Sequence, residues 1–127
     1  MNIIVCTDDR GGILFNRRRQ SQDRILRKKV LSDTTGKRLW MNAYSARQFF
    51  DAPPGRITED EDFLSKAGPG EFCFAEGTPL LPYLSKIEQV ILFRWNRKYP
   101  ADVYLDLPLD RPPWHLTEQS EFSGHSH

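Results

Sequence analysis

The sequence has few of the residues that build disulfide-bonded or metal-bound domains. It contains 2 cysteines and 3 histidines among 127 residues. Neither Cys6 nor Cys73 belongs to a CxxC pair, and each lies in an apolar run, where a thiol behaves as a small hydrophobic side chain. Two cysteines do not make a disulfide scaffold in a chain of this length. We therefore expect two free thiols and no metal site.

Long apolar runs and an excess of one charge are also missing. No stretch approaches the roughly 18 apolar residues of a transmembrane helix, and the first apolar run lacks the basic flank of a signal peptide. The balance of 18 Lys and Arg against 17 Asp and Glu argues against a globally basic nucleic-acid-binding protein. We expect a cytoplasmic protein without a membrane partner that folds as a single domain over residues 1–127.

Apolar runs and helical patterns alternate along the whole chain. Strands are predicted at 2–7, 37–42, 71–77, 89–95 and 114–122. Helices are predicted at about 21–32, 43–50 and 78–88, with one or two further helical turns around 58–64. Strands alternating with helices predict an α/β protein, and specifically a three-layer αβα sandwich.

Local signals predict where the helices begin and which strand is most deeply buried. Ser21 is the expected N-cap of the first helix, Thr58 caps the short turns, and Thr78 precedes Pro79 at the start of the last helix. The continuous apolar residues of 89–95 predict a strand that is covered on both faces.

Three segments resemble the dihydrofolate reductase family. They are GKRLWMNAYSARQF (36–49), EFCFAEGTPLLPYLSKIEQVILFRW (71–95), and ADVYLDL (101–107) followed by WHLTEQSEFSGHSH (114–127), and Asp102 stands where the family has an aspartate. The order of elements is also similar: strand, turn, helix, strand, helix, loop, strand, glycine, helix, strand, Asp, strand. The resemblance implies a shortened dihydrofolate reductase-like fold, NADPH as the hydride source, and Asp23 as the catalytic proton donor.

The chain departs from that family where the cofactor phosphates would bind. Asn42 and Ala43 replace the glycine and basic residue that start the phosphate-binding helix, although Ser45 still offers a donor there. Glu76 and Gly77 replace the paired glycines beside the pyrophosphate, and a carboxylate there repels a diphosphate. We interpret these departures as loss of the standard NADPH-binding motifs.

A second resemblance carries no residue roles. The patterns FNRRRQSQD and RWNRKYPADVY are similar to short bacterial proteins, some of which are labelled ribonuclease Z. That label implies an HxHxDH di-zinc motif, which this sequence does not contain.

Two basic segments are candidate binding sites. Arg17, Arg18 and Arg19 stand just before a predicted helix N-terminus, which favours an anion, although charge runs are more often solvated helix faces. Trp95 and Arg97 follow a predicted strand, beyond whose carboxyl end ligands of α/β sheets collect. Trp95 can stack on a planar ring there, or it can simply cover the sheet edge.

These observations predict a domain that binds a small anionic or nucleotide-like ligand. The predicted ligand-binding residues are Arg17, Arg18, Arg19, Asn42, Ser45, Gly77, Trp95 and Arg97. If the protein is an enzyme, it is an NADPH-dependent oxidoreductase with Asp23 as proton donor; otherwise Asp23 is a helix-start charge paired with nearby arginines. The alternative function is a nucleic-acid or protein interaction module that uses the basic segment 17–29.

Overall fold

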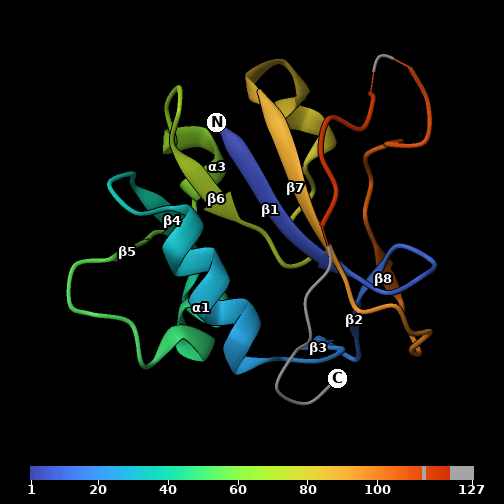
Figure 1. The fold of residues 1–127 in the computed structure, drawn as a ribbon, viewed down its shortest axis with the longest axis horizontal. Coiled ribbons are helices and arrows are strands. Elements are labelled where there is room, and N and C mark those ends of the chain that lie inside the picture. The colour runs from blue at the N-terminus through green and yellow to red at the C-terminus, as the bar shows by residue number, and fades with distance from the viewer. Residues whose placement is uncertain (113, 121–127) are drawn as a thin grey trace.

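A parallel five-stranded sheet forms the centre of the molecule. The structure, a computed structural model, describes residues 1–112 and 114–120. The strands follow the order β5-β4-β6-β1-β7 (Figure 1). They are β1 (Asn2–Thr7), β4 (Leu39–Met41), β5 (Ile57–Glu59), β6 (Phe72–Phe74) and β7 (Gln89–Arg94). The predicted α/β class is therefore confirmed.

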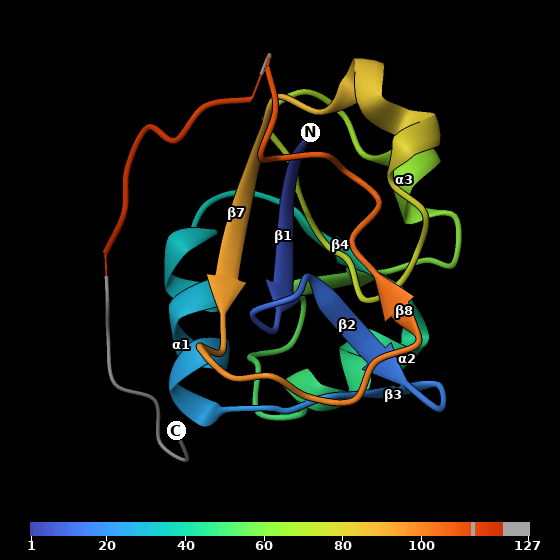
Figure 2. The same ribbon diagram turned by 90° about the vertical axis from the view of Figure 1, so that its right-hand side faces the viewer.

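Helices cover both faces of this sheet. They are α1 (Arg24–Asp33), α2 (Ala43–Ala46), α3 (Phe63–Lys66) and the 3-10 helices η1 (Arg47–Phe49) and η2 (Leu81–Lys86). Ile4 packs in a core with α1 and η1, whereas its neighbour Ile3 packs with α3 and the start of η2. This alternation follows from the two-residue period of a strand. Figure 2 shows α1 and α3 on opposite sides of β1. No helix of the described residues is long and apolar enough to cross a membrane.

A small antiparallel sheet, which the sequence did not predict, lies beside the carboxyl end of β1. It consists of β2 (Gly12–Phe15), β3 (Arg18–Arg19) and β8 (Val103–Tyr104), in the order β3-β2-β8. The β2–β3 hairpin turns on two residues, Asn16 and Arg17, whose φ angles are 50° and 62°. Two residues with positive φ form the turn that best matches strand twist, and an Asn-Gly pair is its usual signal. The Asn16-Arg17 pair lacks the glycine of that signal, so the sequence does not mark this turn.

Strand β7 is a strand as predicted, but its two faces are covered only in part: Val90 packs against one core, and Phe93 belongs to the other. It lies at the end of the strand order and pairs with β1, and Gln89, Leu92 and Arg94 are exposed. By contrast, every residue of β1 except the half-buried Cys6 is buried. Both strands are apolar runs, and only the order of strands in the sheet decides which one is central.

Three predicted helix starts are wrong. Helix α1 begins two residues later than expected, because Asp23 rather than Ser21 is its N-cap. Thr58 is not a cap, since it lies within β5. Thr78 does not cap η2, which follows Leu80.

The predicted strand at 114–122 is not observed over the described residues. Residues 114–120 have no regular secondary structure, and 121–122 lie outside the described part of the chain. The predicted helical turns around 58–64 are partly wrong, because β5 occupies Ile57–Glu59 and pairs with β4, and the short helix α3 begins only at Phe63. The three residues of β5 are too few to show a two-residue period in the sequence.

Asp8, directly after β1, is a buried carboxylate that ties three segments together. Its Oδ1 accepts hydrogen bonds from the backbone N–H groups of Arg10 and Gly12, both at 2.8 Å. Its Oδ2 accepts from the Tyr99 N–H at 3.0 Å and from Gln20 Nε2 at 3.2 Å. Burial by itself raises the pKa of Asp8, but these donors stabilise the carboxylate and hold its pKa below the ordinary value.

Replacing Asp8 by Asn is expected to destabilise the fold by about 2 kcal/mol at pH 7, because buried N–H donors lose a charged acceptor. Urea unfolding measures the change. Asp9→Asn is the matched control, since its ion pair with Arg94 spans 3.6 Å and both side chains are partly exposed. The control should cost less than about 1 kcal/mol.

The same pair of proteins gives a pH test. Because the folded pKa of Asp8 is lower than that of the unfolded chain, its contribution is complete above the unfolded value and is lost as pH falls through the folded one. The stability gap between wild type and Asp8→Asn should therefore narrow in acid below the ordinary aspartate pKa. A gap that widens in acid would contradict the assignment.

Candidate functional site

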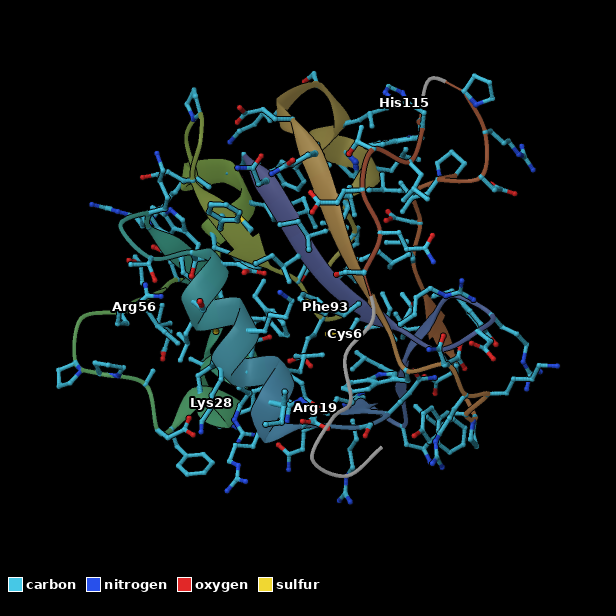
Figure 3. All side chains as sticks on the ribbon, in the orientation of Figure 1. Cys6, Arg19, Lys28, Arg56, Phe93 and His115 are labelled. Atoms are coloured by element: carbon cyan, nitrogen blue, oxygen red, sulfur yellow. The ribbon has the colours of Figure 1, made fainter. Side chains whose placement is uncertain are left out.

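The carboxyl ends of the parallel strands meet at one edge of the large sheet, and the β2–β3 hairpin lies across that edge (Figure 2). Ligands of open α/β sheets collect beyond such an edge. Asn42 follows β4, Glu76 follows β6 after one residue, and Trp95 follows β7. Cys6 lies near the end of β1, and Figure 3 shows it at the same edge as Arg19.

Arg19 and Glu76 form a buried ion pair at this edge. Arg19 Nε donates to Glu76 Oε2 at 2.9 Å, and Nη2 donates to Oε1 at 3.0 Å. The Ser45 hydroxyl also donates to Oε1, at 2.8 Å. Two parallel N–H bonds to one carboxylate are the strongest geometry for such a pair. Glu76 is 8% exposed, so its charge needs this partner.

Tyr44 of α2 completes the surroundings of Arg19. The guanidinium carbon lies 4.4 Å from the centre of the Tyr44 ring, and Nη2 donates to the Tyr44 carbonyl at 3.2 Å. The Tyr44 hydroxyl in turn accepts from the Arg19 backbone N–H at 2.7 Å. Burial tends to lower the pKa of Arg19, but the Glu76 carboxylate outweighs it, and the pKa of Arg19 is raised. The arginine is therefore a permanent cation with its acceptors already in place.

A small pocket, called the polar pocket below, adjoins this ion pair. Its volume is about 10 Å³, and its lining combines the polar side chains of Arg19, Gln20, Ser21, Gln48 and Glu76 with Cys6, Ile13, Leu26, Phe74 and Trp95. A space of this size holds roughly one water molecule. A larger ligand must therefore rest on the pocket mouth or displace part of its wall.

Two buried amide atoms in the pocket residues have unused hydrogen-bonding capacity. Gln20 Oε1 and Gln48 Nε2 have no hydrogen-bond partner within the described structure. The partners of Gln20 fix the orientation of its side-chain amide, because Nε2 donates to two acceptors, Asp8 Oδ2 and the Pro100 carbonyl. Its oxygen must therefore face the other way. A buried acceptor and a buried donor without partners favour binding of a polar group.

The two cysteines are not nucleophiles in this environment. Both are free, as expected. Burial, together with the nearby Glu76 charge, raises the pKa of the Cys6 thiol far above its ordinary value, although Arg19 opposes the shift. Burial likewise raises the pKa of Cys73 to about 12. Thiolate chemistry at neutral pH is disfavoured at both positions.

The structure brings together some of the predicted site residues. Arg19 and Trp95, which are far apart in sequence, line the same pocket. Arg17 and Arg18 are exposed at the turn of the β2–β3 hairpin, and Arg97 is exposed with its carbonyl accepting from the Asp9 N–H. These three arginines do not line the polar pocket.

The basic segment 17–29 is divided by the fold. Arg19 turns inward to Glu76, and Arg27 is buried 3.7 Å from the Asp51 carboxylate and over the Phe50 ring. Lys28 is exposed on α1, on a different element from Arg19 (Figure 3). The segment therefore does not present its charges on one continuous face.

Asn42 and Asp23 both cap helices. Asn42 Oδ1 accepts from the Ser45 N–H at 2.9 Å at the start of α2. Asp23 is buried, and its Oδ1 accepts from the N–H groups of Ile25 at 2.7 Å and Leu26 at 3.4 Å. Capping bonds of this kind stabilise the start of each helix.

Gly77 has a clear packing reason to be glycine. Its φ is +86°, a conformation that L side chains rarely adopt, and a Cβ added there would lie 2.5 Å from Leu14 Cδ1. The space over its Cα is therefore filled by Leu14 of β2.

Asp8, Gln20, Gln48 and Tyr44 were missed as site residues from the sequence. The turn signal DDRGG places an aspartate at the start of a turn, which is a usual position for this residue. The two glutamines and the tyrosine carry no local signal, because only the packing of distant segments buries them.

Comparison with known proteins adds no family to this description. No protein-family model matches the sequence, and no curated protein matches it. Over the residues that the structure describes, no three His, Cys, Asp or Glu side chains gather as metal ligands.

Gly77→Ala should destabilise the protein by about 2–4 kcal/mol, because it adds both backbone strain and a clash with Leu14. Gly55→Ala is the control, since Gly55 has φ +81° but no atom within 4 Å of its added Cβ. It should cost about 1 kcal/mol. Thermal unfolding of both variants measures the difference, and equal losses would contradict the packing role of Gly77.

Glu76→Gln should destabilise the protein by about 2 kcal/mol, because Arg19 keeps a hydrogen-bond acceptor but loses its countercharge in a mostly buried position. Urea unfolding measures this change. Asp60→Asn, which removes the charge from an exposed ion pair with Lys66 at 2.6 Å, should leave the unfolding midpoint nearly unchanged. An unchanged unfolding midpoint for Glu76→Gln would show that the ion pair does not hold the β2–β3 hairpin in place.

Proposed function

We propose that the protein is a shortened dihydrofolate reductase-like domain that binds a small anionic or nucleotide-like ligand. The order of elements agrees with the resemblance in part: β1, α1, β4, α2, β6, Gly77, η2 and β7 occur in that order, with the β2–β3 hairpin inserted before α1 and with β5 and α3 inserted before β6. The last strand of the resemblance, predicted at 114–122, is not observed over the described residues. The five parallel strands also offer a carboxyl edge, where ligands of α/β sheets bind.

The observation that carries the proposal is the meeting of two predicted segments. Arg19, Gln20 and Ser21 from the first segment and Trp95 from the second line one pocket at this edge. Trp95 supplies an aromatic side chain to the pocket lining, and the amide atoms of Gln20 and Gln48 that lack partners supply polar contacts in the same lining. Taken alone, the first segment is more typical of a solvated charge run and Trp95 of a side chain that covers the sheet edge, but their convergence favours a ligand site.

The anionic part of the ligand belongs at the exposed arginines of the hairpin turn. Arg19 is already neutralised by Glu76, and taking it from that carboxylate would leave a buried charge without a partner. Arg17 and Arg18 stand next to it in the chain and are exposed. We therefore assign the ring to Trp95 and the phosphate or carboxylate to Arg17 and Arg18.

Binding without reduction is the form of the proposal that the contacts favour. Ser45 and Glu76 bond each other where the family would hold the cofactor diphosphate. If the protein nevertheless reduces a substrate, NADPH supplies the hydride and Asp23 donates the proton. That role competes with the capping bonds of Asp23 to the start of α1.

Titration with adenosine monophosphate, followed by tryptophan fluorescence, tests this proposal. We expect saturable quenching that Trp95→Phe abolishes, since Trp40 and Trp114 remain as unaffected fluorophores. Arg17→Ala with Arg18→Ala should weaken binding about tenfold, through lost charge-assisted bonds. Arg111→Ala is the matched control, because Arg111 is an exposed arginine on a different turn.

Three results would overturn parts of the proposal. Absence of quenching at millimolar adenosine monophosphate rejects the ligand site. Absence of any response to millimolar NADPH rejects only the reductase form. Retention of single-stranded RNA that falls steeply between low and physiological salt would instead favour the interaction module, because released counterions make such binding salt-dependent.

A further inference from the structure

A second hollow, the apolar cavity, lies between the large sheet and the small sheet. Its volume is about 150 Å³, and its apolar wall includes Val5, Ile13, Ala75, Leu80 and Val103. Val5 and Ala75 alternate with Cys6 and Glu76 along their segments, so the apolar cavity and the polar pocket open from opposite faces of the sheet. Ile13 of β2 borders both.

The size of the apolar cavity limits what it can hold. A hollow of about 150 Å³ has room for a molecule the size of benzene. Sites for drug-sized ligands are larger, at about 300–1,000 Å³. The cavity therefore fits one six-membered ring and excludes a fused ring system or a ring with a sugar.

Polar residues also line the apolar cavity, and Asp106 carries the charge among them. Asp106 lines the cavity together with Thr78 and Tyr104, and within the described chain it is the lining residue with a formal charge. Its carboxylate is held in place by the Leu80 N–H, at 3.0 and 3.2 Å, and by the Leu81 N–H at 3.0 Å. Carboxylate oxygens can accept further hydrogen bonds beyond these two donors. A cation or an N–H donor beside Asp106 is favoured, and an anion is repelled.

We propose that the apolar cavity binds a single aromatic ring that bears an amine, with the ring against Val5, Ala75 and Val103 and the ammonium group toward Asp106. This site does not depend on the proposed anion site, since none of its lining residues is among the arginines or Trp95. Binding in the apolar cavity needs no rearrangement of the strand edges or of the polar pocket.

Benzylamine, benzyl alcohol and benzoate test the site, because they share one ring and differ in the charge of one substituent. Backbone amide shifts in ¹H–¹⁵N spectra of the full chain measure binding. We expect benzylamine to shift the amides of Ala75, Gly77 and Val103 at millimolar concentration. Asp106 is exposed, so its charge should change affinity only modestly. Benzyl alcohol should bind about three- to tenfold more weakly than benzylamine, and benzoate more weakly than benzyl alcohol.

Two kinds of variant separate the charge from the shape. Asp106→Asn keeps an acceptor for the Leu80 and Leu81 N–H groups, and it should bring benzylamine down to the affinity of benzyl alcohol. Asp110→Asn, an exposed acid that does not line the cavity, should leave the affinity unchanged. Val103→Ile and Ala75→Val fill the cavity and should abolish binding of all three probes, with cooperative thermal unfolding as the check that each variant folds.

The outcomes are decisive in both directions. Absence of benzylamine shifts at millimolar concentration overturns the site, and so does unchanged affinity in a folded cavity-filling variant. Binding of benzoate as tight as that of benzylamine overturns the role of Asp106. The adenosine monophosphate titration should be the same in wild type and Asp106→Asn, so failure of one site does not count against the other.

Discussion

The bidentate pair between Arg19 and Glu76 is the interaction on which the candidate site depends. A carboxylate that is buried after a central strand is costly unless a cation and further donors meet it. Arg19 reaches it from β3, and Ser45 reaches it from α2. A pair of this kind contributes little net stability, but either charge alone is strongly unfavourable. The pair therefore specifies where the β2–β3 hairpin lies relative to the large sheet, and with it the wall of the polar pocket.

Asp8 is a second buried carboxylate, and it is stabilised by hydrogen bonds rather than by a cation. Its carboxylate is satisfied by N–H groups from the turn after β1, from Gln20 and from the loop at Tyr99. Gln20 links the two arrangements, since its amide nitrogen is held by Asp8 and its side chain lines the polar pocket beside Arg19. The edge where ligands would collect is thus organised by two buried carboxylates, one neutralised by an arginine and one solvated by the backbone.

The large parallel sheet separates two hollows, the polar pocket on one face and the apolar cavity on the other. Alternate residues of β1 and of the segment after β6 face opposite sides, so Cys6 and Glu76 border the polar pocket while Val5 and Ala75 border the apolar cavity. Gly77 allows Leu14 of the small sheet to approach the large one closely. The small sheet is therefore what closes both hollows, and its short strands are the part of the fold with the weakest sequence signal.

The sequence by itself determined the α/β class, the runs that became β1, β4, β6 and β7, and the helix that became α1. These follow from side-chain periodicity and apolar runs, which are local properties of the chain. It also pointed to Arg19 and Trp95 as site residues. Only the tertiary structure decided that β7 is an edge strand, that Asp23 caps α1, and that Glu76 meets an arginine 57 residues earlier in the chain. The reason is that strand order and the partner of a buried charge depend on which distant segments the fold brings together, and no local pattern records that choice.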